Sequence, residues 1–380
     1  MSDSVPATPP PETPRGLRYV NDDEPGMTRE KRGDEFIYKT SSGKTVRDQD
    51  TLDRIRSLAI PPAYTDVWIC ERENGHLQAT GRDARGRKQY RYHPKYREHR
   101  DSRKYEHMIE FARVLPAIRA RVKKDMGLPG LPREKVIATV VALLESTLIR
   151  VGNEDYARDN KSYGLTTLRE KHIDVKGSEL RFQFKGKSGK NWNLKLADRR
   201  IAKVVRQCQD LPGQHLFQYV DDEGERRVVT SADVNDYLRA ISDQDISAKD
   251  FRTWAGTVLA ALALREFEAF DSATLAKKNI KAAIQRVAER LGNTPTICRK
   301  CYIHPEIVTT YLDGALANEL EQKAEKEFEH LADLQPEEAA VLALIRRRLN
   351  VESGKRKAGA KAARKPRPSR EGAFTRKKAA

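Results

Sequence analysis

The sequence contains no apolar run that approaches the length of about 20 residues needed by a membrane-spanning helix. Its first 15 residues are rich in proline, serine and threonine and contain no apolar signal core. Together these two absences predict a protein that makes no contact with a membrane and lies in the cytoplasm.

Cysteine is scarce as well. Four cysteines in 380 residues are too few to form a disulfide framework. Cys298 and Cys301 form one Cys-x-x-Cys pair with His304 nearby, which invites a zinc interpretation. A single pair without a second one at a suitable distance is a weak metal signal, so we expect no bound metal.

Acidic residues are outnumbered, with 55 Asp and Glu against 72 Lys and Arg. The formal net charge of +17 and the pI of about 9.6 predict an anionic polymer as the partner. No Gly-x-x-x-x-Gly-Lys-Ser/Thr loop is present, so nothing in the sequence predicts ATP binding.

Changes in composition divide the chain into five predicted parts. They are a disordered leader (1–15), a small β-rich domain (16–105), a larger and mainly α-helical domain (106–335), a C-terminal helix (336–353) and a disordered basic tail (354–380). The tail has eleven Lys or Arg, one Glu and almost no large apolar residue. The predicted fold class is therefore α+β.

Hydrophobic periodicity predicts the main elements. In the first domain we expect strands at 67–70, 77–81 and 88–92, the last two joined by a hairpin connection. In the second domain, alternation over 180–196 around Gly186-Lys187-Ser188-Gly189 predicts a β-hairpin with a basic tip. Helical patterns cover 136–149, 196–208, a segment capped by Thr230, 247–267 and 272–291. A charged helical region follows over 316–349, interrupted near Leu334-Gln335-Pro336.

Four residues in this second domain have the chemistry of a phosphate site. Arg150 follows an apolar helix, where it is either a C-terminal cap or a phosphate ligand. Lys187 is one of four lysines around a hairpin tip, which are often simply solvated. Arg252 lies near a predicted helix start, where a cation opposes the helix dipole and so suggests an anionic ligand. Tyr302, one of thirteen tyrosines, lies in a basic segment.

Six segments together resemble the type IB DNA topoisomerases in their compact bacterial and poxvirus form. The resemblance covers residues 16–313 and implies the tyrosine recombinase/topoisomerase IB fold, in which the small domain closes over DNA opposite the catalytic domain. The matching segments are Arg87-Lys88-Gln89-Tyr90-Arg91-Tyr92, Arg150-Val151-Gly152, Tyr163-Gly164-Leu165-Thr166-Thr167-Leu168, Phe184-Lys185-Gly186-Lys187, Lys249-Asp250-Phe251-Arg252-Thr253-Trp254, and Gly292-Asn293-Thr294-Pro295 with Tyr302.

The resemblance assigns roles to the site residues. Tyr302 is the implied nucleophile, Arg150 and Arg252 the implied ligands of the scissile phosphate, and Lys187 the implied proton donor to the 5′ leaving oxygen. Asn293 departs from the family pattern, because poxvirus and eukaryotic members have histidine here. Asparagine can donate a neutral N–H to a phosphate oxygen without adding charge. Alternatively, Asn293 is only a turn residue after a glycine helix stop.

Further residues are expected to contact the duplex. Arg87 and Lys88 would hold phosphates while Tyr90 and Tyr92 pack on the DNA, unless this segment is merely a solvated basic hairpin. Two other residues, Tyr156 and Lys249, complete the expected DNA contacts.

The implied activity is relaxation of supercoiled duplex DNA through a 3′-phosphotyrosyl intermediate, without ATP or metal, by a nucleoid-associated monomer. Two alternatives stay open. A site-specific tyrosine recombinase would use the same nucleophile and arginines, but is expected to have histidine at position 249 and to act as a tetramer. A non-catalytic DNA-binding protein would explain the charge and the tail, but would not require Tyr302.

Overall fold

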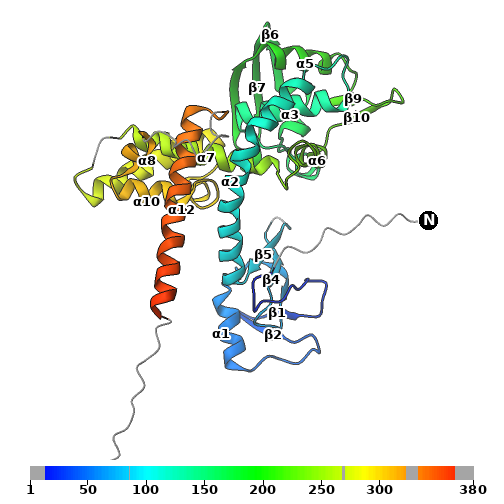
Figure 1. Ribbon diagram of the computed structural model, residues 1–380. Coiled ribbons are helices and arrows are strands. Elements are labelled where there is room, and N and C mark those ends of the chain that lie inside the picture. Colours follow the sequence, from blue (N-terminus) through cyan, green and yellow to red (C-terminus); the bar gives the residue numbers. More distant parts are fainter. Residues whose placement is uncertain (1–12, 85, 268–269, 322–332, 364–380) are drawn as a thin grey trace, which may run out of the picture. The chain divides into compact units, whose positions relative to one another are not determined.

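The computed structural model describes residues 13–84, 86–267, 270–321 and 333–363. The chain forms two compact units that divide between Glu106 and His107. The first unit contains an antiparallel sheet and the second is mostly helical (Figure 1), so the predicted α+β class is confirmed. The leader up to residue 12 lies outside the described residues. In the described part of the chain, no helix is both long and apolar enough to cross a bilayer.

The first unit is built on a five-stranded antiparallel sheet of order β2-β1-β3-β4-β5. One helix, α1 (Gln49–Ser57), contributes Ile55 to the core beneath the sheet. The predicted strands and their hairpin are confirmed, and two further strands precede them. The strands are β1 (Met27–Arg32), β2 (Glu35–Lys39), β3 (Thr65–Ile69), β4 (Leu77–Arg82) and β5 (Lys88–Tyr92).

Most side chains of strands β1 and β2 are exposed or only half-buried. These strands therefore show no alternation of apolar and polar residues from which they could be predicted. The long helix α2 (Pro94–Asp125) was missed at its start for a similar reason. Its first turns are highly charged and lack an apolar stripe. The sequence therefore does not distinguish them from the β-rich domain predicted to extend to residue 105. The helix in fact begins at Pro94 in the first unit and continues into the second.

The second unit packs its helices around α3 (Arg133–Thr147) and α7 (Ala248–Arg265), whose inward side chains are almost fully buried. The predicted helix stop at Gly292 is confirmed, because Gly292 adopts a left-handed conformation as the C-cap of α8 (Ala273–Leu291). The other helices are α4 (Glu154–Asn160), α5 (Arg199–Gln209), α6 (Ser231–Ser242), α8 (Ala273–Leu291), α9 (Pro295–Tyr302), α10 (Pro305–Leu312), α11 (Leu316–Glu321) and α12 (Pro336–Ala363).

The predicted hairpin of the second unit is present, but it belongs to a three-stranded sheet. Strand β6 (Ile173–Lys176) pairs with β7 (Glu179–Lys185), which pairs with β8 (Asn191–Ala197). A second small hairpin, β9 (Gln218–Val220) and β10 (Arg226–Val228), was also not predicted. Its strands are only three residues long, which is too short for a visible alternation of apolar residues.

Helix α12 packs against α7, α10 and α11 (Figure 1). The apolar side chains of its first half are buried. The helix continues to Ala363 and so includes the first ten residues of the predicted disordered tail, which starts at Gly354. These ten residues consist of Ala, Lys, Arg and Gly, and the first three are strong helix formers, so low hydrophobicity did not exclude a helix. The rest of the predicted tail, 364–380, lies outside the described residues.

Candidate active site

Arg150 is placed by a sharp end to helix α3. The helix stops at Thr147, two residues before the predicted end, and Leu148 adopts a left-handed conformation with φ of 58°. The chain then passes through Gly152 so close to Gly164 that a Cβ on Gly164 would lie 2.5 Å from the Arg150 carbonyl oxygen. This crossing, held by a 2.9 Å hydrogen bond from the Leu165 amide to that carbonyl, fixes the backbone of Arg150.

Lys187 lies in the turn between β7 and β8 and is exposed. The base of the turn is tied to the Arg150 region, because the amide of Tyr163 donates a 2.9 Å hydrogen bond to the carbonyl of Lys185. The two segments that the sequence motifs singled out are therefore joined by backbone contacts.

Arg252 is buried in the second turn of α7, with 3% of its surface exposed. The expectation that it opposes the dipole of a first helical turn is therefore wrong. The start of α7 is instead neutralised by the capping box of Ser247 and Asp250. Arg252 donates to the carbonyl of Leu148, and at 2.7 Å to the carbonyl of Leu291.

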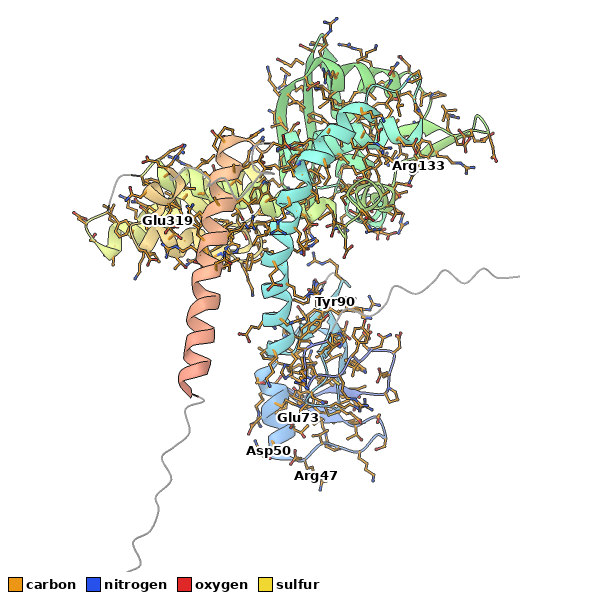
Figure 2. All side chains as sticks on the ribbon, viewed as in Figure 1. Arg47, Asp50, Glu73, Tyr90, Arg133 and Glu319 are labelled. Carbon is orange, nitrogen blue, oxygen red and sulfur yellow. The ribbon has the colours of Figure 1, made fainter. Side chains whose placement is uncertain are left out.

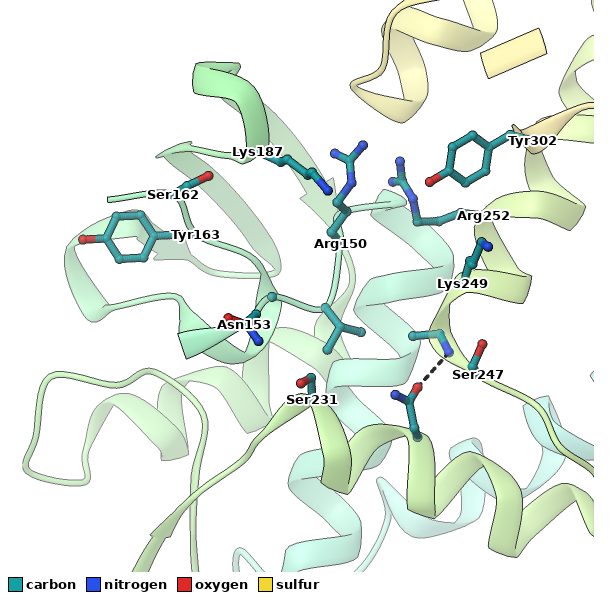
Figure 3. Close-up of a pocket in the computed structure, with 14 residues that line it drawn as sticks. Arg150, Asn153, Ser162, Tyr163, Lys187, Ser231, Ser247, Lys249, Arg252 and Tyr302 are labelled. Atoms are coloured by element: carbon teal, nitrogen blue, oxygen red, sulfur yellow. Dashed lines mark hydrogen bonds between the residues drawn. The ribbon is translucent and has the colours of Figure 1, made fainter. Parts of the chain in front are cut away.

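Tyr302 is the last residue of α9, and its hydroxyl points toward Arg252 (Figure 3). The guanidinium carbon of Arg252 lies 5.3 Å from the centroid of the Tyr302 ring. A glycine makes this approach possible, because a Cβ on Gly256 of α7 would lie 2.6 Å from the Tyr302 carbonyl oxygen.

Asn293 follows the glycine cap of α8, and its side-chain oxygen accepts a hydrogen bond from Arg150. Its Nδ2 is buried and has no hydrogen-bond partner among the described residues. A buried amide donor without a partner costs free energy, about 1–3 kcal/mol, unless a ligand satisfies it. Asn293 therefore contributes an N–H donor beside the arginine.

The C-terminus of α8 holds three cations together. The carbonyl of Glu289 accepts from Lys190, that of Leu291 from Arg252, and that of Gly292 from Arg150 at 3.4 Å. The last carbonyls of a helix lack intrahelical partners and carry the negative end of its dipole. This arrangement lets like charges lie close together before any anion is bound.

Burial and the nearby charge of Arg150 lower the pKa of Arg252 to about 10. The guanidinium therefore remains protonated at neutral pH, but its positive charge is not fully balanced by nearby negative charge. Its Nε is buried without a hydrogen-bond partner among the described residues. An anion placed between Arg150 and Arg252 would supply the missing charge and acceptor.

These groups line one cavity of about 350 Å³ (Figure 3). Four of the five predicted catalytic residues are on its wall, and Asn293 adjoins it through Arg150. Lys249, which is one of the predicted DNA contacts, also lines this cavity. Several polar residues on the wall lie outside the six matching segments and have only the weaker sequence signal of a loop or a helix start: Asn153, Ser162, Ser231 and Ser247. Asn235, inside α6, has no such signal.

The predicted DNA contacts of the first unit lie on or beside β5. Tyr90, labelled in Figure 2, belongs to β5. It is 47% exposed and stacks on the half-buried Tyr92. Arg87 and Lys88 form ion pairs, with Asp83 at 2.7 Å and Asp22 at 2.5 Å. A DNA phosphate that binds Arg87 or Lys88 would therefore have to compete with the carboxylate of Asp83 or Asp22.

Two further predictions are that Tyr156 contacts DNA and that the Cys298–Cys301 pair binds no metal. The side chain of Tyr156 lies outside the described residues. Among the residues that the structure describes, no group of three or more His, Cys, Asp or Glu side chains is arranged to hold a metal ion. Cys298 is fully buried, and this burial raises the pKa of its thiol to about 11.

Comparison with known proteins extends over most of the chain. Residues 93–331 match the family of the eukaryotic DNA topoisomerase I catalytic core, and residues 35–83 match the N-terminal domain of bacterial DNA topoisomerase IB. DNA topoisomerase 1B of Acanthamoeba polyphaga mimivirus is 32% identical over 286 residues, which cover 73% of this chain and 85% of the viral protein.

Two less similar relatives are also DNA topoisomerases. DNA topoisomerase 1B of vaccinia virus (strain Copenhagen) is 24% identical across 70% of this chain and 83% of its own. DNA topoisomerase 1 of rabbit fibroma virus is 25% identical across 77% and 95%. The catalytic-core family covers more than half of the chain, and the mimivirus relative passes 30% identity over most of both proteins. The chain therefore belongs to the type IB DNA topoisomerases.

Proposed function

We propose that this isomerase relaxes supercoiled duplex DNA by cutting and rejoining one strand, with Tyr302 as the nucleophile. The observation that carries the proposal is the position of the Tyr302 hydroxyl beside Arg252, on the same cavity wall as Arg150 and Lys187. Two arginines, a lysine and a phenol around one space match the requirements of a phosphodiester transesterification.

In the cleavage step, the Tyr302 oxygen attacks the phosphorus and loses its proton to solvent. The bond between phosphorus and the 5′ oxygen breaks, so the tyrosine becomes linked to the 3′ phosphate. Arg150, Arg252 and the Nδ2 of Asn293 would hold the non-bridging oxygens as charge builds on them. Preorganised donors of this kind usually contribute most to catalysis.

Lys187 would protonate the departing 5′ oxygen and accept the proton back on religation. General acid catalysis contributes about 10²–10⁴-fold. Lys187→Ala should therefore cleave slowly, yet a substrate with sulfur at the 5′ bridging position should restore its rate, because a thiolate leaves without a proton. Equal slowing on both substrates would exclude Lys187 as the acid.

The activity itself is tested by incubating supercoiled plasmid with the protein in EDTA and without ATP. We expect a ladder of relaxed topoisomers, since the phosphotyrosyl bond conserves the energy of the cleaved bond. A recombinase would instead exchange strands between two duplexes, and a non-catalytic DNA-binding protein would leave the superhelicity unchanged.

We further propose that the enzyme works as a monomer in the cytoplasm, associated with the nucleoid, and prefers supercoiled DNA. All the proposed catalytic groups come from one chain, so one copy suffices for the chemistry. The net charge of +17 favours a location on DNA. Sedimentation of the protein with a short duplex would reveal one copy per site if this is correct and two or four if it is not.

A further inference from the structure

Trp192 lies between two glycines that belong to different parts of the proposed site. A Cβ on Gly186 would lie 2.7 Å from Trp192 Nε1, and a Cβ on Gly292 would lie 2.7 Å from Trp192 Cζ2. Both positions exclude a side chain, so the indole makes close contact with both backbones. Gly186 directly precedes Lys187, and Gly292 directly precedes Asn293.

Two further contacts hold this arrangement in place. On the sheet side, Trp192 is the cross-strand partner of Phe184, and their rings stack at 6.1 Å with an interplanar angle of 8°. On the helix side, the Lys190 ammonium donates a 3.0 Å hydrogen bond to the carbonyl of Glu289 near the end of α8. Its Nζ also lies 5.9 Å from the Trp192 ring centroid.

We propose that Trp192 and Lys190 form a latch that docks the Lys187 turn onto the C-terminus of α8 and thereby positions Lys187 for proton transfer. The inference rests on the proposed function of Lys187. Trp192 does not line the cavity and is a positioning residue, because it acts through the turn rather than on the DNA.

The physical need for such a latch follows from the turn itself. Lys187 is exposed, and its long side chain has many rotamers. A proton donor must come within about 3 Å of the leaving oxygen to act. Asn293 directly follows the cap of α8, and the last carbonyls of α8 accept hydrogen bonds from both arginines. Fixing the backbone of the turn against this helix end holds the acid and the phosphate ligands in a fixed relative position.

The test compares Trp192→Ala with Lys187→Ala on ordinary DNA and on DNA with a 5′ bridging sulfur, in single-turnover cleavage. We expect Trp192→Ala to cleave ordinary DNA at least about 10-fold more slowly than the wild type, and to approach the wild-type rate on the sulfur substrate. The double variant should be no slower than Lys187→Ala alone. Equal slowing of Trp192→Ala on both substrates would overturn the latch.

Control variants separate positioning from general damage. Lys195→Ala, on the same strand but paired with Glu179, should cleave both substrates normally. Trp192→Phe keeps an aromatic ring on Phe184 and should recover part of the rate. If Trp192→Ala does not fold, Lys190→Met removes the ammonium that contacts both α8 and the Trp192 ring but keeps the indole. It should show a smaller loss, again rescued by sulfur, and an unrescued loss there would contradict the proposal.

The outcomes also distinguish this inference from the function on which it rests. If sulfur rescues Lys187→Ala but not Trp192→Ala, only the latch fails. If sulfur rescues neither variant, both the assignment of Lys187 as the acid and the latch fail.

Discussion

The guanidinium of Arg252 lies over the ring of Tyr302, with 5.3 Å between its central carbon and the ring centroid. A phenol has a pKa of about 10 and is a weak nucleophile unless a nearby cation stabilises its oxyanion. Arg252 is suited to this, because it is buried, fixed by two backbone carbonyls and protonated at neutral pH. One residue can therefore stabilise both the nucleophile and the phosphate.

Asn293→Ala should slow single-turnover cleavage by about 10²–10³-fold, the typical cost of removing one donor to an oxyanion. The physical reason is the loss of the buried Nδ2 donor and of the acceptor for Arg150. Asn293→His should retain activity, since a histidine can also donate to the phosphate. An unchanged cleavage rate in the alanine variant would show that Asn293 is only a turn residue.

Gly256→Ala should slow cleavage at least about 10-fold while the protein remains folded, since small overpacking usually costs about 1–3 kcal/mol. The added methyl would meet the Tyr302 carbonyl oxygen at 2.6 Å and its Cβ at 3.1 Å, so α9 must shift. Thermal melting serves as the folding control. A wild-type cleavage rate in this variant would mean that the position of Tyr302 tolerates such a shift.

His107→Gln should lower stability in a pH-dependent way. The carboxylates of Asp250 and Glu110, at 3.5 and 3.3 Å, raise the pKa of His107 to about 9. Because the folded pKa exceeds the unfolded value of 6.5, the stabilisation is complete below pH 6.5 and is lost as the pH rises through 9.

We expect a loss of about 1–2 kcal/mol at pH 6, reduced by partial solvent exposure, and none near pH 10. Urea unfolding of both proteins at several pH values measures the difference. A gap that stays constant with pH would contradict the ion pair.

Deleting residues 354–380 should weaken DNA binding without slowing the chemistry at saturating protein. The segment carries a net charge of +10 and lies beyond all the proposed catalytic residues. Each phosphate neutralised contributes about 0.9 to the slope of log affinity against log salt. A second truncation after Ala363 would separate the helical part from the remainder. An unchanged salt slope would exclude an electrostatic role.

The sequence predicted elements with a clear apolar period and missed those without one. The strand around Trp68 and helix α5 have such a pattern, and α7 stands out as a long apolar stretch. Strands β1 and β2 and the first turns of α2 are too polar to show it. The basic segment after Gly354 lacks large apolar residues, yet its Ala, Lys and Arg favour a helix, so low hydrophobicity alone does not predict disorder there.

The residues of the candidate site could be found from motifs, but their supports could not. No local pattern indicates that Trp192 contacts Gly292, or that the carbonyls ending α8 hold Arg150 and Arg252. Such contacts join segments up to about 140 residues apart and depend on tertiary packing, which periodicity does not encode.

The most direct test of the account is a covalent-adduct assay with Tyr302→Phe. The wild-type protein, mixed with nicked or suicide duplex DNA in EDTA, should form an adduct in which Tyr302 is linked to a 3′ phosphate and the released end is a 5′ hydroxyl. Tyr302→Phe should bind the same duplex with similar affinity, form no adduct and leave supercoiled plasmid unrelaxed. An adduct on another residue, or relaxation by the phenylalanine variant, would contradict the assignment of Tyr302 as the nucleophile.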